Sequence, residues 1–282
     1  MGLGFLPFVP KPPIVAVIRL TGMISPMPRA FRGNLNLAGL AGQIDRAGAM
    51  KGVRAIALQV NSPGGSPVQS ELIAKRLRSV ARDSEVPLFA FVEDVAASGG
   101  YWLACAADEI FAERSSLIGS IGVVSSGFGF TEAIERLGVE RRVHAQGKHK
   151  AMLDPFRPEN ADDVGRLESL QQEIHEAFKD HVRDRRGKRL KGDDEALFEG
   201  DVWTGEGALA LGLIDGIGDM RTVMRDRFGK KVRLRLMGAQ RSWFRRRVGM
   251  SRAPGLELDS HTLVSGALAA VEERALWARF GL

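Results

Sequence analysis

The chain has 282 residues, of which 44% are hydrophobic and 26% charged, and its net charge is +6. The length gives room for one large α/β domain or two small ones, with a core that needs neither disulfides nor metals for stability. The single cysteine, Cys105, excludes an internal disulfide, and its place among small apolar residues predicts a buried structural thiol rather than a nucleophile.

Apolar runs rich in β-branched residues alternate with amphipathic segments in the first half of the chain. The runs predict buried strands at residues 14–20, 53–60, 87–92, 109–112 and 120–125. Helices are predicted between them at residues 37–49, from about 68 to 77, and at 100–107. This alternation is typical of an α/β fold with a largely parallel sheet.

The clearest helix of the second half covers residues 161–185, with Asn160 as N-cap and Gly187 as the stop. One face of it is apolar and predicts a core or a subunit interface; its residues are Val164, Leu167, Leu170, Ile174, Phe178 and Val182. Further elements are expected as a short helix at 206–212, an edge strand at 232–236 and a terminal amphipathic helix at 261–280. A linker is expected near 238–258.

Neither end of the chain predicts a membrane span, because prolines interrupt the apolar residues 3–17. The expected location is the cytoplasm, with peripheral membrane contact through Phe5, Leu6 and Phe8. A basic cluster near the C-terminus fits either a solvated tail or contact with a membrane surface. Its residues are Arg241, Trp243, Phe244, Arg245, Arg246, Arg247 and Arg252. The expected division is a tail at 1–13, one domain at 14–237 and a basic tail at 238–282.

Small residues surround the first candidate site, Ala96-Ala97-Ser98-Gly99-Gly100. A serine between a strand and a helix start has an exposed hydroxyl beside free N–H groups. Such groups, with the Gly99 amide the best placed, can stabilise an oxyanion. The motif alone fits a nucleophile and a simple helix N-cap equally well.

A second glycine-rich turn, Ser62-Pro63-Gly64-Gly65-Ser66, follows the strand at 53–60. Adjacent glycines let the backbone approach a ligand closely, so Gly64 or Gly65 can supply a second oxyanion donor. Pro-Gly-Gly is also a common turn, so this motif alone leaves the question open.

A nucleophilic serine needs a general base, and no histidine lies close after Ser98 in the sequence. Lysine is the alternative, provided that burial away from carboxylates lowers the pKa of its amine. The candidate is Lys150, although a lone lysine is usually a surface side chain. Ser120, after Gly119, can orient a neutral lysine as the third member of a triad, or can be a small residue at a strand entrance.

Five segments together resemble peptidase family S49, the signal peptide peptidase A group and its relatives. They are VNSPGGS at 60–66, VAASGGYWLACAADEIFA at 95–112, LIGSIGVV at 117–124, GKHKAMLDPF at 147–156 and GDVWTGEGALALGLID at 200–215. Their order and spacing match throughout this stretch, which is far more specific than any single motif.

The resemblance implies a ClpP/crotonase-like fold of repeated ββα units with parallel sheet layers flanked by helices, in one copy at 14–237. It implies Ser98 as nucleophile, Lys150 as general base with Lys148 as the fallback, and Ser120 hydrogen-bonded to the lysine. Amides of the SPGG loop and of Gly99 would form the oxyanion hole. Family members are homo-oligomers, here of the tetramer or octamer type, and in short forms the serine and lysine can come from neighbouring subunits.

The implied activity is that of a serine endopeptidase acting through an acyl-enzyme on signal-peptide remnants or other small or unfolded peptides. No metal, nucleotide or organic cofactor is needed, and no nucleic-acid partner is expected. Many relatives carry an N-terminal membrane anchor that this sequence does not show. Two alternative functions are left open by the sequence. One is a crotonase-type acyl-CoA enzyme on the same fold, and the other is a non-catalytic membrane-associated scaffold.

Overall fold

The computed structural model describes residues 12–26, 34–238, 271, 274–275 and 277–281. The N-terminal contact residues, the basic cluster and nearly all of the linker near 238–258 lie outside the described residues. So does most of the predicted helix at 261–280, of which the described residues 271, 274–275 and 277–278 are helical.

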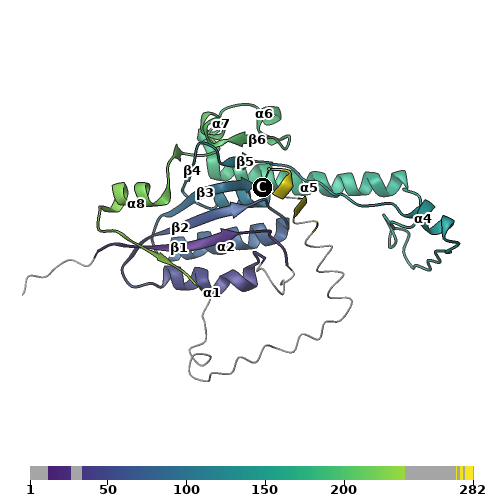
Figure 1. Ribbon diagram of the computed structural model, residues 1–282, viewed down its shortest axis with the longest axis horizontal. Coiled ribbons are helices and arrows are strands. Elements are labelled where there is room, and N and C mark those ends of the chain that lie inside the picture. Colours follow the sequence, from purple (N-terminus) through teal and green to yellow (C-terminus); the bar gives the residue numbers. More distant parts are fainter. Residues whose placement is uncertain (1–11, 27–33, 239–270, 272–273, 276, 282) are drawn as a thin grey trace, which may run out of the picture.

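Strands and helices alternate along the chain much as predicted (Figure 1). The strands are β1 (Ile14–Thr21), β2 (Val53–Ser62), β3 (Leu88–Ala97), β4 (Glu109–Ala112), β5 (Leu117–Gly119), β6 (Val202–Thr204), β7 (Gly216–Ile217) and β8 (Arg233–Leu236). The helices are α1 (Leu37–Gly48), α2 (Pro67–Asp83), α3 (Gly99–Ala104), α4 (Thr131–Arg136), α5 (Ala161–Arg186), α6 (Asp194–Phe198), α7 (Gly205–Ala210) and α8 (Met220–Phe228), with a 3-10 turn at Gly187–Arg189.

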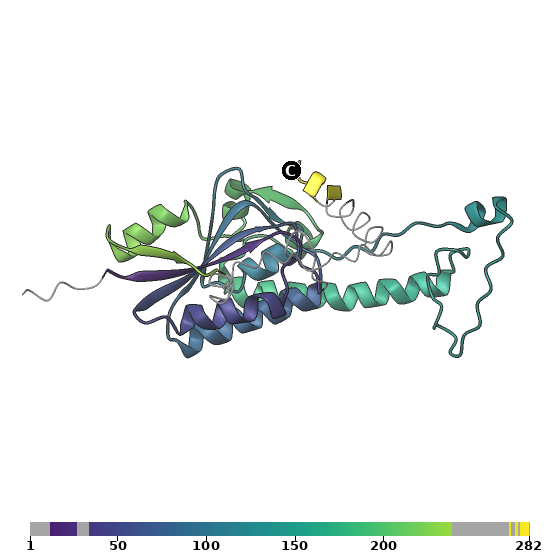
Figure 2. The same ribbon diagram turned by 60° about the horizontal axis from the view of Figure 1, so that its bottom comes forward.

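One sheet joins these strands in the order β6-β5-β3-β2-β1-β8, and every pair on this path is parallel except β5 with β6. Helices α1 and α2 cover one face and α8 covers part of the other (Figure 2). Strands buried on both faces read as unbroken apolar runs, which is why β1 and β2 were recognisable in the sequence. The predicted α/β class with a parallel sheet is confirmed.

Strand β3 pairs with two strands on the same side, one after the other. Its first half, Phe89–Val92, pairs with β4, and its last residues, Val95–Ala97, pair with β5. This fork sets Ala97 opposite Gly119 in the register. The residues that follow, Ser98 and Ser120, therefore leave the sheet side by side.

The predicted strand at 120–125 is wrong, because the strand of this region is β5 and ends at Gly119. Ser120 has a φ of 50°, and its N–H donates to the carbonyl of Asp201 at 2.6 Å. That turn takes the chain out of the sheet, so the apolar residues after it do not pair.

The chain after Ser120 forms an arm, defined here as residues 124–174, which includes α4 and the first half of α5 (Figures 1 and 2). The second half of α5 packs into the core through Phe178 and Val182. The same apolar face is exposed on the arm, where Leu170 is 52% and Ile174 37% accessible. Helix α4 buries none of its residues. The arm thus presents apolar side chains that remain exposed in the part of the chain that the structure describes.

Candidate active site

Ser98 precedes α3 in a backbone conformation that a non-glycine residue rarely adopts, with φ 52° and ψ −124°. Its N–H donates to the Gly119 carbonyl at 2.8 Å, and its own carbonyl accepts from Trp102 at 3.0 Å. Its side chain makes no capping hydrogen bond, whereas Ser66 caps α2 through its hydroxyl. Ser98 therefore does not behave as a simple N-cap. Its half-buried hydroxyl is left available for chemistry.

The SPGG loop packs directly on this turn. A Cβ atom built on Gly64 would lie 2.8 Å from Ser98 Cβ and 2.9 Å from the Gly99 nitrogen, so only glycine fits there. The Gly64 amide donates to Ser62 Oγ at 3.2 Å. The Gly65 amide donates to no acceptor among the described residues, and its nitrogen is 3.4 Å from a Cβ built on Gly99.

Gly99 is the first residue of α3, so its N–H has no partner within the helix. Two free backbone donors, from Gly65 and Gly99, thus lie next to the Ser98 turn. A pair of such donors can stabilise a negatively charged oxygen.

Ser120 joins this group through the register of β3 and β5, as described above, and is half-buried. Both serines have positive φ values, 52° and 50°, which among the described non-glycine residues is shared only by Glu85 and Leu153. Such strained conformations concentrate at functional sites. The structure thus brings Ser98, Ser120, Gly64, Gly65 and Gly99 together.

Lys150 is not brought to this group within one chain. It is exposed, in a turn closed by its N–H to the Gly147 carbonyl at 3.1 Å. Its neighbour His149 lies 3.9 Å from Asp163, in the first turn of α5. His175, twelve residues further along α5, touches the carbonyl next to Ser120, so about 18 Å of helix separates the two levels. An extended lysine side chain does not span that distance.

The predicted fallback, Lys148, lies in the same segment and is also exposed. On a strand, a two-residue step would put both lysines on one side. Residues 148–153 form turns instead, so the fold does not make Lys148 equivalent to Lys150.

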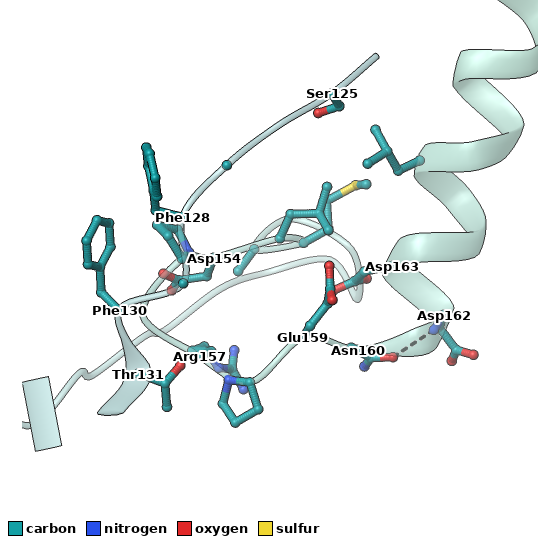
Figure 3. Close-up of a pocket in the computed structure, with 18 of the residues that line it drawn as sticks. Ser125, Phe128, Phe130, Thr131, Asp154, Arg157, Glu159, Asn160, Asp162 and Asp163 are labelled. Atoms are coloured by element: carbon teal, nitrogen blue, oxygen red, sulfur yellow. Dashed lines mark hydrogen bonds between the residues drawn. The ribbon is translucent and has the colours of Figure 1, made fainter. Parts of the chain in front are cut away.

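A cavity of about 1170 Å³ lies in the arm and not at Ser98. Figure 3 shows its lining from the loop at Ser125–Thr131, the segment at 148–159 and the start of α5, where Asn160 caps the helix. Phe128 and Phe130 project at its rim, and Phe128 is 81% exposed. Asp154 accepts from the Phe156 N–H, which together with Arg141 keeps the pKa of its carboxyl low against the opposing effect of desolvation.

Cys105 ends α3 and is fully buried, and desolvation raises the pKa of its thiol to about 11. The prediction of a buried structural thiol is confirmed.

The family model described as "Peptidase family S49" matches residues 80–233, more than half of the chain. The chain belongs to peptidase family S49. Its α/β architecture with a parallel sheet agrees with the ClpP/crotonase-like fold predicted for this family.

Relatives of this S49 chain differ in name. A Brucella abortus protein named Na(+)/H(+) antiporter NhaA is 48% identical over 277 residues, which is 95% of this chain and 37% of that protein. The chloroplastic serine protease SPPA of Arabidopsis thaliana is 33% identical over 213 residues, 73% of this chain and 31% of that protein. A solved structure of a membrane-bound stomatin-specific protease variant aligns with a TM-score of 0.49 at 16% identity, covering 81% of this chain and 99% of that one.

The chain spans only about a third of the length of these two curated relatives. The antiporter name belongs to a much longer protein. In the part of the S49 chain that the structure describes, no helix has the length and apolar character to cross a membrane.

The sequence analysis did not identify two residues that contact the main chain near the site. His175 and His181 of α5 bind carbonyls next to Ser120 and within α3. They lie far from Ser98 in the sequence. Helical periodicity predicted the helix that carries them but not which residues they contact.

Proposed function

We propose that this chain is a serine endopeptidase in which Ser98 attacks the peptide carbonyl and is acylated. The observation that carries the proposal is the uncapped Ser98 hydroxyl, held at a strained strand-to-helix turn against the SPGG loop. Membership of family S49 supports the same activity.

The oxyanion hole in this proposal consists of the amides of Gly65 and Gly99. Gly64 is the weaker candidate, because its amide already donates to Ser62 Oγ. Its role is then to allow the close approach of the loop to Ser98, which a side chain would prevent.

The general base in this proposal is Lys150 of a second copy of the chain. A lysine amine is neutral near pH 7 only where it is desolvated, and Lys150 of the single chain is exposed. The uncovered apolar residues of the arm, such as Leu170 and Ile174, support an assembly in which the arm packs on another copy. Docking of the arm would bury the amine and bring it to Ser98 and Ser120.

The reaction then runs as acyl transfer. Neutral Lys150 takes the proton from Ser98 Oγ as the oxygen bonds to the carbonyl carbon, and the oxyanion accepts from the Gly65 and Gly99 amides. The ammonium group of Lys150 next protonates the leaving amine as the peptide bond breaks. The neutral amine then takes a proton from a water, whose oxygen attacks the ester carbonyl. As the ester bond breaks, the ammonium group of Lys150 returns that proton to Ser98 Oγ. Ser120 accepts or donates one hydrogen bond to hold the lysine.

The experiment uses a fluorophosphonate probe, which reacts with activated serines, and a set of fluorogenic peptides. We expect Ser98→Ala to abolish both labelling and hydrolysis, and Lys150→Ala to lower both by at least about 10³-fold. Ser115→Ala, a change at an exposed serine outside the site, is the matched control. Retained peptide hydrolysis by a folded Ser98→Ala variant would refute the proposal, and turnover of an acyl-CoA by it would favour the crotonase-type rival.

The substrate class is proposed as small or unfolded peptides, including signal-peptide remnants. The Arabidopsis relative is named a serine protease, and others of the curated relatives are named for signal peptide peptidase. Cleavage of unstructured peptides with no cleavage of the same sequences in folded proteins is the expected pattern.

A further inference from the structure

Helix α3 is too short to hold Ser98 in place by itself. It has six residues, and isolated helices of this length are not stable. Its position depends on what binds its C-terminal end, where backbone carbonyls lack partners within the helix. The Trp102 carbonyl is one of these, because the next available amide, that of Ala106, donates to Leu103 instead.

Side chains of α5 bind these carbonyls. His181 Nε2 lies 3.1 Å from the Trp102 carbonyl oxygen, and Arg185 donates to the carbonyls of Cys105 and Ala107 at 2.9 and 3.0 Å. A carbonyl can only accept, so His181 donates from Nε2. Its ring also stacks on Trp102, with centroids 4.9 Å apart and planes 15° apart.

A second histidine of α5 makes the same kind of contact on the other side of the site. His175 Nε2 lies 3.2 Å from the carbonyl oxygen of Ile121, the residue after Ser120. One helix therefore binds the main chain next to both serines, and the same helix continues into the arm that carries the Lys150 segment.

We propose that His175 and His181 are positioning residues, which fix the turns of Ser120 and Ser98 relative to α5 through their Nε2–H groups. The inference deepens the proposed function and depends on it. Its consequence is that the nucleophile and Ser120 of one chain are both positioned by the same helix, so that a shift of α5 moves the two serines together.

The test compares substitutions that separate the ring from the donor. His181→Phe keeps a ring for stacking on Trp102 but lacks the N–H, whereas His181→Gln keeps an N–H donor without the ring. His175→Phe and His175→Gln form a second, independent pair. Ala177→Ser, an uncharged change at an exposed position of the same helix between the two histidines, is the control.

We expect each Phe variant to lower kcat for a fluorogenic peptide about 10-fold or more with KM within about twofold, because misplacement of reacting groups acts on the chemical step. Each Gln variant should recover to within about threefold of the unchanged protein. The rate of fluorophosphonate labelling at Ser98 should follow kcat.

A folded Phe variant with unchanged kcat would overturn the proposal, as would Gln variants that are no better than their Phe counterparts. If His181→Phe does not fold, as judged by near-UV circular dichroism, the His175 pair decides by the same criteria. Failure of the proposed function is distinguished by Ser98→Ala: if that variant keeps its activity, the nucleophile is wrong, whatever the histidine variants do.

Discussion

Ser98, the proposed nucleophile, has an unfavourable backbone conformation. At φ 52° and ψ −124° it occupies a region that suits glycine, and such outliers cost about 1–3 kcal/mol each. The motif Ala97-Ser98-Gly99 alone fitted a nucleophile and a helix N-cap equally well, and it did not predict this conformation, since φ depends on the register of β3 with β5 and on the hydrogen bond to Gly119.

Replacement of Ser98 by glycine should therefore separate stability from activity. We expect Ser98→Gly to be more stable than Ser98→Ala by about 1 kcal/mol, because only glycine relieves the strain, while both variants lose all peptidase activity. Chemical denaturation measures the difference. Glu85→Gly, at another residue with positive φ (53°), is the control and should gain stability without any loss of activity. Equal stability of the two Ser98 variants would mean that the turn is not strained in solution.

The sequence could not distinguish Gly64 from Gly65 as an oxyanion donor, because both satisfy the same motif. The distinction depends on where each amide points, and the loop geometry gives the Gly64 N–H to Ser62 Oγ. Lys150 illustrates the opposite limit: the segment around it was recognisable in the sequence, but the fold of a single chain leaves this lysine exposed and away from Ser98.

At the scale of elements, α5 was the best predicted helix, but the buried contact in its last turn was not predicted. Its caps at Asn160 and Gly187 are as predicted. In its last turn, however, Arg186 is buried and binds Asp215 at 2.7 Å and the Gly212 carbonyl at 2.8 and 2.9 Å. Burial opposes charge on Asp215, but the hydrogen bond from Arg186 keeps the pKa of this carboxyl below its usual value. Contacts between residues that lie this far apart in the sequence leave no periodic pattern in it.

Loss of this ion pair should destabilise the whole domain. We expect Arg186→Met to lower the free energy of unfolding by about 3–5 kcal/mol, because it leaves the Asp215 carboxylate with only the partly exposed Arg189 as a charged partner and removes two hydrogen bonds to the Gly212 carbonyl. Arg183→Met removes a partly exposed arginine of the same turn and should cost no more than about 1 kcal/mol. Urea denaturation of both variants checks the comparison, and equal losses would show that Arg186 is no more important than a surface arginine.

Stability should also depend on pH through His181. Desolvation and the nearby Arg185 lower the pKa of this imidazole below 6.5, against its bond to the Trp102 carbonyl and the opposing charges of Asp184 and Glu71. The unfolded chain therefore takes up the proton first as pH falls. Stability is unaffected above about pH 6.5 and declines below it, until the folded state also protonates. We expect His181→Gln to flatten this decline between pH 7 and 5 in denaturation experiments, and an unchanged slope would contradict the assignment.

At the scale of the whole molecule, the arm extends the chain away from the sheet and its packed core. The sequence indicated an apolar face on α5 that fits a core or a subunit interface, and the structure divides that face between the two: Phe178 and Val182 are buried, Leu170 and Ile174 exposed. Periodicity finds an apolar face but does not say what covers it.

Mixing two inactive variants tests whether the site is completed by another copy. Ser98→Ala and Lys150→Ala chains should each be inactive alone. Co-expressed in equal amounts, they should regain about a quarter of full activity, since a random assembly pairs an intact serine with an intact lysine at one site in four. A mixture as inactive as its components would place both groups in the same copy.

Leu170→Glu should weaken the proposed assembly without unfolding the chain. The substitution puts a charge on an exposed apolar position, so the mass in solution should fall while the thermal midpoint stays within a few degrees. Gln172→Glu, an exposed polar position on the same helix, should change neither. An unchanged mass for Leu170→Glu would show that this face is not the contact.

Cys105 makes the junction of α3 with α5 observable without any engineered probe. It is the sole thiol of the 282 residues, it is enclosed completely, and three arginines of α5 and the turn after it surround it electrostatically. An alkylating reagent can reach it only when these helices separate. The rate of its modification in the native protein therefore measures how often α3, the helix that follows Ser98, separates from α5. Neither a melting curve nor an activity assay measures this opening.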